Sequence, residues 1–243
     1  EGDAAGQALA AAVSGEQIIT MAVRSTAGDR ALLVPAAAVA DQAIVLVGDR
    51  LLLVPLAGNV TVVENLASMP LAAVTIPADA VELATGAAAV AAHDRALDDW
   101  LALTSAALVG IAARALEIGV DYVKERKAWG VAIGSFQGIS HRLADSAAAS
   151  DGARLLAYEA AWADEEEPGQ FGELAAMAFG FAYEAARDAT YRSLHFHGGY
   201  GFMMEYDIQL YYRRARGWTN VYGESDVAYR RVADRRYGKV GAN

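Results

Sequence analysis

Three short stretches of the sequence carry residue types that could do chemistry. The first is "ERKAWGVAIGSFQ", residues 125–137, where a helical pattern reaches Arg126, breaks over the glycines at 130 and 134, and then resumes. An arginine beside the exposed amides of a broken helix suits a phosphate, because the guanidinium group pairs well with phosphate oxygens. The alternative at this point is that Arg126 is an ordinary surface residue without a ligand.

The second stretch is "HFHGGYGF", residues 195–202, in which three glycines follow the end of a helical pattern. Glycine permits positive φ and close backbone approach, so these amides could face a phosphate or an adenine ring. The alternative is that the glycines only end the helix. His195 and His197 point to different faces of a helix, and no carboxylate cluster accompanies them, so we expect no metal site.

The third stretch is "VYGESDVAYRR", residues 221–231, where Glu224 precedes a helical pattern. A carboxylate there could be a general base, or it could only stabilise the positive end of the helix. The wider segment 213–239 is basic, which suggests either a local anionic ligand such as a phosphate or a solvated helix face. Its eight lysine and arginine residues are Arg213, Arg214, Arg216, Arg230, Arg231, Arg235, Arg236 and Lys239.

The composition narrows the class of protein. The chain has 243 residues, of which 55% are hydrophobic, and its net charge of -10 argues against general nucleic-acid binding. The absence of cysteine excludes disulfides, thiolate metal sites and cysteine nucleophiles, and we expect a cytoplasmic protein. No run of about 18 strongly apolar residues and no secretory signal is evident, so we expect no membrane span. The first residue is Glu1 rather than Met, which leaves open a longer native chain.

The elements that must position these stretches change in character along the chain. Short β-rich runs separated by turn signals predict a small antiparallel sheet over residues 17–77, which contain four of the five prolines. Helical periods follow, and long helices with short loops predict an antiparallel four-helix bundle. The expected helices cover residues 88–127, 135–163, 170–196, 205–216 and 224–237, and residues 164–170 are expected to form an acidic loop. The fold class is therefore α+β, with three segments: the end of a helical region (1–16), a middle β-domain (17–85) and a helical bundle (86–243).

The stretches "ERKAWG", "FQGISHRLAD" and "HGGYGF", in this order, resemble the C-terminal domain of the acyl-CoA dehydrogenase family. The earlier stretch "AAAVSGEQIITMAV" resembles the segment that leads into the middle β-domain of the same family. The resemblance covers nearly the whole chain. It implies a small β-domain followed by a four-helix bundle, while the N-terminal helical domain of the family is absent from this sequence.

The resemblance also implies a cofactor. Family members bind FAD across a subunit interface, and the arginine that matches Arg126 meets the pyrophosphate of a neighbouring subunit's FAD. His195 stands where the family has glutamine, and histidine can still form a hydrogen bond. The residues that the resemblance places at FAD are Arg126, Trp129, Gln137, His195, Gly198 and Gly199.

The catalytic glutamate of the family has no counterpart in register. At the common position of this glutamate the resemblance places Tyr222 or Gly223. Glu224 is one or two residues away, and a shift of one residue turns a helical side chain by about 100°, so Glu224 does not occupy the base position. At the second known position the chain has Trp100. The nearby carboxylates of Asp98 and Asp99 are also out of register, and we expect them to be solvated. We therefore assign no catalytic residue, with Glu224 as the alternative.

A flavin-binding loop is missing as well, because "RSTAGDRALLVP" follows "ITMAV" almost directly. The chain therefore resembles the catalytically incomplete subunit of the α2β2 acyl-CoA dehydrogenases by which actinobacteria degrade the side chains of steroids such as cholesterol. This implies a homologous catalytic partner that supplies the glutamate and binds most of the acyl-CoA. The alternatives are an autonomous acyl-CoA dehydrogenase with Glu224 as base, and a scaffold protein without a cofactor. The partner, the acyl chain and the electron acceptor stay open.

Overall fold

The computed structural model of the chain describes residues 2–238, and the side chains from residue 4 onward. The chain divides into two compact units, Glu1–Leu97 and Asp98–Asn243, called unit 1 and unit 2 below. Each unit is described by itself. The long helix α2 (Gly86–Glu125) begins in unit 1, and the larger part of it belongs to unit 2.

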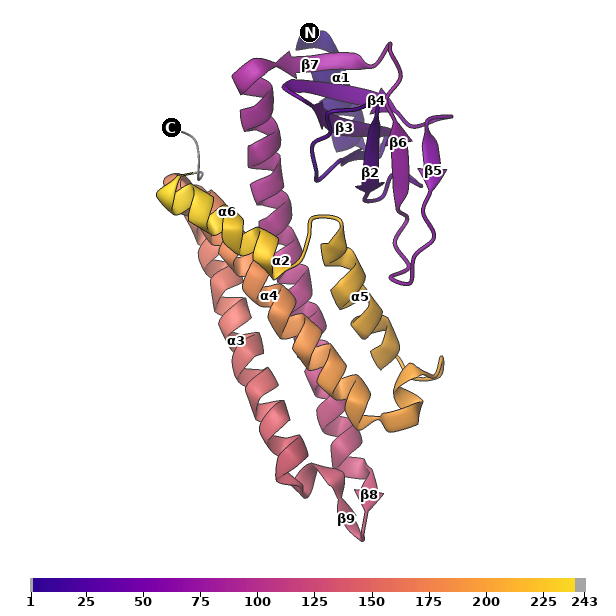
Figure 1. Ribbon diagram of the computed structural model, residues 1–243, viewed down its shortest axis with the longest axis vertical. Coiled ribbons are helices and arrows are strands. Elements are labelled where there is room, and N and C mark those ends of the chain that lie inside the picture. Colours follow the sequence, from indigo (N-terminus) through magenta and orange to yellow (C-terminus); the bar gives the residue numbers. More distant parts are fainter. Residues whose placement is uncertain (1, 239–243) are drawn as a thin grey trace. The chain divides into compact units, whose positions relative to one another are not determined.

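Unit 1 begins with α1 (Gly2–Ser14) and continues with seven strands in two small sheets (Figure 1). One sheet has the strand order β1-β3-β4-β7 and the other the order β2-β6-β5. All pairs are antiparallel except that β1 runs parallel to β3, so the sheet differs from the expected antiparallel one at this edge. The strands are β1 (Ile19–Met21), β2 (Arg30–Val34), β3 (Gln42–Val47), β4 (Arg50–Pro55), β5 (Val60–Val62), β6 (Ala72–Thr75) and β7 (Val81–Thr85).

Valines from different strands form the centre of the unit 1 core. Val34, Val45, Val54 and Val74 are fully buried in one apolar cluster, as expected for β-branched residues on a pleated sheet. The connection between β1 and β2 is short and is fixed to the sheet, because the Thr26 amide donates to the Leu46 carbonyl oxygen. The segment after "ITMAV" therefore has no room for a long flavin-binding loop.

Unit 2 consists of long helices joined by very short connections. After α2 come a small hairpin, the helices α3 to α6 and two 3-10 turns, and each helix starts and ends within a few residues of the predicted bounds. Glu167 alone separates α3 from α4, so the expected acidic loop is wrong: most of it continues the helices. Pro168 is the first residue of α4, where its missing N–H costs no helical bond. The elements are β8 (Lys127–Ala128), β9 (Val131–Ala132), η1 (Ile133–Ser135), α3 (Gln137–Glu166), α4 (Pro168–Phe196), η2 (Gly198–Phe202), α5 (Ile208–Asn220) and α6 (Ser225–Tyr237).

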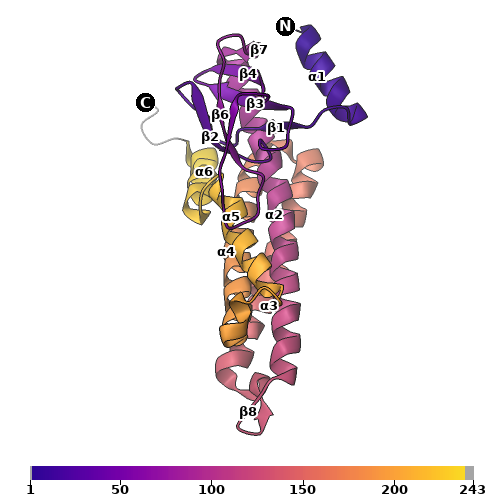
Figure 2. The same ribbon diagram turned by 90° about the vertical axis from the view of Figure 1, so that its right-hand side faces the viewer.

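Helix α4 is the central helix of unit 2, and it packs against α3, α5 and α6 (Figures 1 and 2). Small residues on its faces allow the neighbouring helices to approach closely. Where α2 meets α4, a Cβ on Gly119 would lie only 2.8 Å from the Ser193 hydroxyl oxygen. The predicted α+β fold, a small β-domain followed by a helical bundle, is confirmed.

Helix α2 is also long and apolar enough to cross a membrane, by length and composition only. It contains an 18-residue window with a mean hydropathy of 1.6, of which 33% is buried in the fold. The sequence predicts no membrane span, because no run of about 18 residues is strongly apolar throughout. The core helix of a bundle passes the same test, and Leu101, Leu108 and Ala112 are fully buried in unit 2.

Candidate functional site

A cavity of about 550 Å³ lies in unit 2 where α2 and α4 end. It brings Arg126, Gly198 and Gly199 together, although the arginine and the glycines are far apart in the sequence. Three of the six residues predicted to contact FAD therefore line one space. The lining residues are Tyr122, Arg126, Ile133, Phe196, His197, Gly198, Gly199, Tyr200 and Met203.

A tight hairpin after α2 fixes the position of Arg126. The Arg126 amide still donates to the Tyr122 carbonyl oxygen, and the Ile133 amide donates to the Arg126 carbonyl oxygen at 2.8 Å. Trp129 and Gly130 form the turn between β8 and β9, both with positive φ, at 50° and 82°. Such a two-residue turn matches the strand twist, but positive φ costs a residue other than glycine about 1–2 kcal/mol. The break in the helical pattern is thus a defined hairpin.

The glycine-rich turn η2 forms another wall of the cavity. Gly198 has a φ of +60°, and a Cβ added to Gly198 or Gly199 would meet no atom within 4 Å. The backbone in front of these two glycines is therefore open to a ligand. Gly201 has the opposite role, because a Cβ there would collide with the Leu194 carbonyl oxygen. Gly201 thus packs the turn against α4, while Gly198 and Gly199 leave the cavity open.

His197 is the histidine that lines the cavity, and the sequence reasoning did not assign it to the site. It is 3% exposed, its ring stacks on Tyr122 with centroids 3.9 Å apart, and its Nδ1 lies 2.7 Å from the Ser193 carbonyl oxygen. Burial lowers the pKa of its imidazole, and the hydrogen bond opposes this only in part. The helical spacing could have predicted the burial of His197, because this residue follows the buried Ser193 by four residues and continues the buried face of α4.

The other three predicted cofactor contacts do not line the cavity. His195 is exposed on the last turn of α4, with its ring 6.0 Å from that of Tyr191. Gln137 is exposed at the start of α3, and Trp129 is 90% exposed on the hairpin. All three belong to elements that begin or end beside the cavity-lining segments. Of the six predicted contacts, three thus line the cavity and three are exposed on the surface.

A metal site is not evident in the part of the chain that the structure describes. Within residues 2–238, no group of three or more histidine or acidic side chains could hold a metal ion. His197 instead has aromatic neighbours, because the edge of the Tyr206 ring also faces it, with centroids 5.7 Å apart. These surroundings suit an organic ligand with a ring and an anionic group.

Aromatic rings fill the region of unit 2 that holds the two base positions of the family. Phe179 is fully buried, and its centroid lies 5.8 Å from that of Trp100 and 5.5 Å from that of Tyr222. Gly223 has a φ of +142°, and a Cβ there would lie 2.6 Å from the Val227 side chain. The two base positions therefore hold aromatic rings or a glycine, and neither presents a carboxylate.

Glu224 is exposed at the N-terminus of α6, and its side chain makes no capping hydrogen bond. Its charge acts on Tyr183, a buried residue of α4. The pKa of Tyr183 is raised, mainly by burial and further by Glu224. A carboxylate favours the positive end of a helix. This placement agrees with the alternative that Glu224 only stabilises the positive end of α6.

Asp98 corrects the expectation of a solvated carboxylate. It is 3% exposed, and Arg231 Nε and Arg235 Nη2 of α6 lie 3.0 Å and 2.6 Å from its two oxygens. A Cβ on Gly172 would lie 2.6 Å from Asp98 Oδ2, so the glycine makes room for the ion pair. The Asp98 side chain is therefore turned toward α6. Its role is to fix α6 to α2.

The basic segment is largely paired within the protein. Besides Arg231 and Arg235, Arg236 pairs with Glu173 at 2.8 Å and Arg230 pairs with Asp226 at 2.5 Å. The α6 arginines thus hold helices together or lie on an exposed face, and neither arrangement needs an anionic ligand. Lys239 lies outside the described residues. On α5, the guanidinium carbons of Arg214 and Arg216 lie 5.9 Å and 5.1 Å from the ring centroids of Trp218 and Tyr212.

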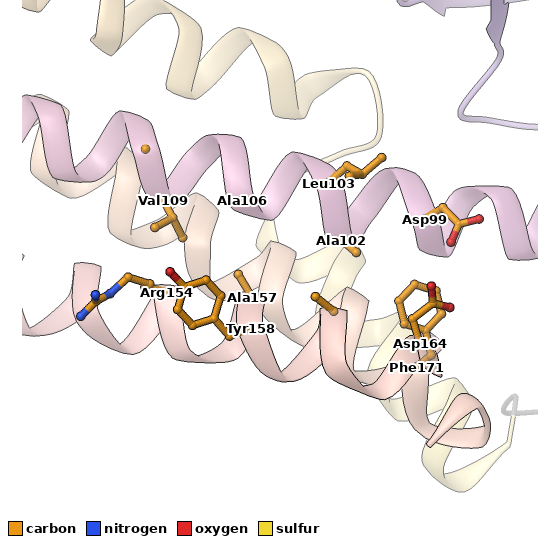
Figure 3. A pocket seen from close by; sticks show the side chains of 12 residues that line it. Asp99, Ala102, Leu103, Ala106, Val109, Arg154, Ala157, Tyr158, Asp164 and Phe171 are labelled. Carbon is orange, nitrogen blue, oxygen red and sulfur yellow. The ribbon is translucent and has the colours of Figure 1, made fainter. Parts of the chain in front are cut away.

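A second cavity, of about 690 Å³, lies between α2 and α3 and is shown in Figure 3. Small apolar residues such as Ala102, Ala106 and Ala157 line much of it. Charged residues also line it, with Arg154 toward one end and Asp99 and Asp164 toward the other (Figure 3). None of the residues predicted to contact FAD belongs to it.

Known proteins share the fold of this chain. The family model "Acyl-CoA dehydrogenase, C-terminal domain" matches residues 95–237, which is more than half of the chain. The chain therefore belongs to the acyl-CoA dehydrogenase family, whose members are oxidoreductases acting on CH–CH bonds.

Curated relatives match a little more than half of the chain. Acyl-CoA dehydrogenase IpdE2 of Mycolicibacterium smegmatis is 35% identical over 148 residues, which are 60% of this chain and 46% of that protein. Probable acyl-CoA dehydrogenase YngJ of Bacillus subtilis is 39% identical over 132 residues, which are 54% of this chain and 34% of that protein. The chain thus spans less than half the length of these relatives.

Solved structures of the same fold cover both units. The ChsE4-ChsE5 complex from Mycobacterium tuberculosis matches with a TM-score of 0.80 at 25% identity, over 92% of this chain and 67% of that chain. The Tcur3481-Tcur3483 steroid ACAD matches with a TM-score of 0.81 at 25% identity, over 93% of this chain and 68% of that chain. The resemblance expected from the sequence motifs is therefore confirmed.

Proposed function

We propose that this chain is a subunit of a heteromeric FAD-dependent acyl-CoA dehydrogenase and that it contacts the ADP part of an FAD held mainly by a homologous partner. One observation carries the proposal: Arg126, Gly198 and Gly199 line one cavity. Two solved structures of the same fold bear names that describe complexes of two different chains. These names support the choice of a heteromer.

The residues present fit the pyrophosphate and nucleoside parts of such a cofactor. The Arg126 guanidinium would pair with pyrophosphate oxygens, and the Gly198 and Gly199 backbone would allow close approach. Tyr122 and Tyr200 supply ring surface for the nucleoside. A volume of about 550 Å³ falls within the ordinary range for small-molecule sites. The exposed Trp129 and Gln137 would extend the contact outside the cavity.

The chemical step is assigned to the partner. FAD, when bound, supplies the acceptor for the substrate hydride, and a glutamate of the partner would remove the α-proton of the acyl-CoA. In this chain, packed rings occupy the two base positions, and Glu224 is an exposed residue at a helix end. The autonomous enzyme with Glu224 as base therefore has less support than the heteromer.

The substrate we propose is a steroid side-chain CoA thioester, bound mainly by the partner in an α2β2 assembly. The support is the name of one solved structure, a steroid ACAD, together with the resemblance found in the motifs. The chain itself contributes contacts to the cofactor in this assembly and no reacting group. Its role would be to complete the FAD site.

The first test is the FAD content of this protein alone and of its complex with the acyl-CoA dehydrogenase encoded beside it, measured by flavin absorbance. We expect no flavin in the lone protein and about one FAD per pair of different chains. In the complex, Arg126→Ala should release FAD during dialysis and Arg126→Lys should retain part of it. The matched control is Arg154→Ala, which changes an arginine outside the FAD cavity.

Each contrary result supports a different alternative. A full complement of flavin in the lone protein would overturn the proposal and favour the autonomous enzyme. Flavin content that is equal in the wild-type and Arg126→Ala complexes would favour a scaffold that makes no contact with the cofactor.

A further inference from the structure

His197 has a fixed orientation at the wall of the FAD cavity. Its Nδ1 lies 2.7 Å from the Ser193 carbonyl oxygen, one turn earlier on α4. The Tyr122 ring stacks on one face of the imidazole, and the Tyr206 ring meets it edge-on. Contacts with three different segments therefore hold the ring in place. A ring held so firmly presents its remaining nitrogen in one direction.

The hydrogen bond to Ser193 fixes the tautomer. A carbonyl oxygen only accepts hydrogen bonds, so Nδ1 must carry a proton. Burial lowers the pKa of the imidazole and keeps the ring neutral near pH 7. In a neutral imidazole with a proton on Nδ1, Nε2 has a lone pair and is an acceptor. His197 thus differs from Arg126, the donor in the same cavity.

We propose that His197 determines the specificity of the cavity for a nucleotide, because its Nε2 accepts a hydrogen bond from a ribose hydroxyl or the adenine amino group. This inference rests on the proposed function, in which the cavity holds the ADP part of FAD. Arg126 would recognise the anionic part of the ligand and His197 its neutral donor groups. Sulfate offers no such donor, so it would gain nothing from His197.

A histidine that only packs against Tyr122 would show a different dependence on pH. Protonation of Nε2 turns the acceptor into a donor, so the affinity for FAD should fall as the pH decreases through the lowered pKa of His197. The groups in contact with this ring are Tyr122 from α2, Ser193 from α4 and Tyr206 beyond η2, and Arg126 and Tyr200 line the same cavity. His197→Phe retains His195, so a flat profile in this variant would assign the acid-side loss of the wild type to His197.

The test uses the complex with the partner after removal of FAD, and measures the dissociation constant for FAD by fluorescence quenching. His197→Phe keeps a flat ring but has no acceptor, and we expect about tenfold weaker binding. His197→Gln can accept through its amide oxygen, and we expect a loss of no more than about threefold. The control His141→Phe replaces an exposed histidine of α3 and should bind like the wild type.

The pH profile and Arg126→Ala distinguish the proposed role of His197 from the proposed binding of FAD in this cavity. As the pH falls from 7.5 through the lowered pKa of His197, wild-type affinity should fall while that of His197→Phe stays constant. If Arg126→Ala weakens FAD binding but His197→Phe does not, His197 only packs and this inference is overturned. If neither variant weakens binding, the proposed function itself fails. Should His197→Phe not fold, the His197→Gln profile decides: a remaining acid-side loss would overturn the inference, and a flat profile would support it.

Discussion

Two regions of unit 2 are built on the same helices, α2 and α4, and differ in what occupies them. Where the helices end, Arg126, His197 and Gly198 line an open cavity. Near their beginnings, Trp100, Phe179 and Tyr222 pack ring against ring. From Trp100 to Tyr122 the distance along α2 is about 33 Å at 1.5 Å per residue. The open region is called the cavity end below, and the other the filled end.

The difference shows that membership of a family does not carry one function to every part of the fold. At the cavity end, positive φ and unobstructed glycines keep backbone accessible. At the filled end, a glycine has the opposite role, since Gly223 allows the chain to pass close to Val227. Under the proposed function, a cofactor contact would persist in a chain whose base positions are packed with aromatic rings.

The largest effect should come from Phe179→Ala, which empties the centre of the filled end. The side chain is fully buried, so we expect a loss of about 4 kcal/mol in the free energy of unfolding, from lost burial and the cavity left behind. The measurement is denaturant unfolding of the chain. Phe202→Ala, at a 62% exposed phenylalanine, is the control and should cost much less. Equal losses in the two variants would contradict the picture of a filled core.

A somewhat smaller loss should follow Asp98→Asn, which leaves two arginines of α6 beside a neutral amide. The Asp98 side chain is 5% exposed and that of Arg231 14%, whereas Arg235 is 36% exposed and partly screened by solvent. We expect a loss of about 3 kcal/mol in the free energy of unfolding. The control is Asp226→Asn, in an exposed pair with Arg230 that should contribute about 0–1 kcal/mol. A cost as small as that of the control would show that Asp98 does not anchor α6.

The sequence predicted the cavity end better than the filled end. Glycine spacing and the arginine at a helix break are local signals that left alternatives open, and the resemblance of these motifs to the family assigned Arg126, Gly198 and Gly199 to one cofactor before their proximity was known. The filled end depends on contacts between α2, α4 and the segment before α6, which no local pattern encodes. Asp98 was misplaced for this reason, since its partners lie more than 130 residues later.

The choice between two histidines shows the same limit on a smaller scale. His195 was selected because it matches a family position, whereas the helical period places His197 on the buried face. The parallel pairing of β1 with β3 could not be predicted either, because strand order depends on long-range contacts. The class of fold followed from the change of periodicity near residue 78, which is a property of the sequence itself.

A modest effect on stability should depend on pH at the cavity end. The pKa of His197 is lowered in the folded state, so below about pH 6.5 the unfolded chain binds a proton that the folded chain resists. His197 therefore contributes stability that is present above pH 6.5 and is lost as the pH falls toward its folded pKa. The slope is at most about 1.4 kcal/mol per pH unit. Unfolding of wild type and His197→Phe at several pH values measures it, and identical profiles would contradict the assignment.

The smallest effect should come from Glu224→Gln, which separates a catalytic carboxylate from one at a helix end. Glu224 is exposed and makes no capping bond, so the loss of its charge at the N-terminus of α6 should cost about 0.5 kcal/mol. Turnover of acyl-CoA by the complex should stay within twofold of the wild type. A catalytic base behaves differently, because its loss lowers kcat by about 10²-fold or more. Such a loss would make the filled end the reacting end, and the contrast between the two ends would no longer describe this protein.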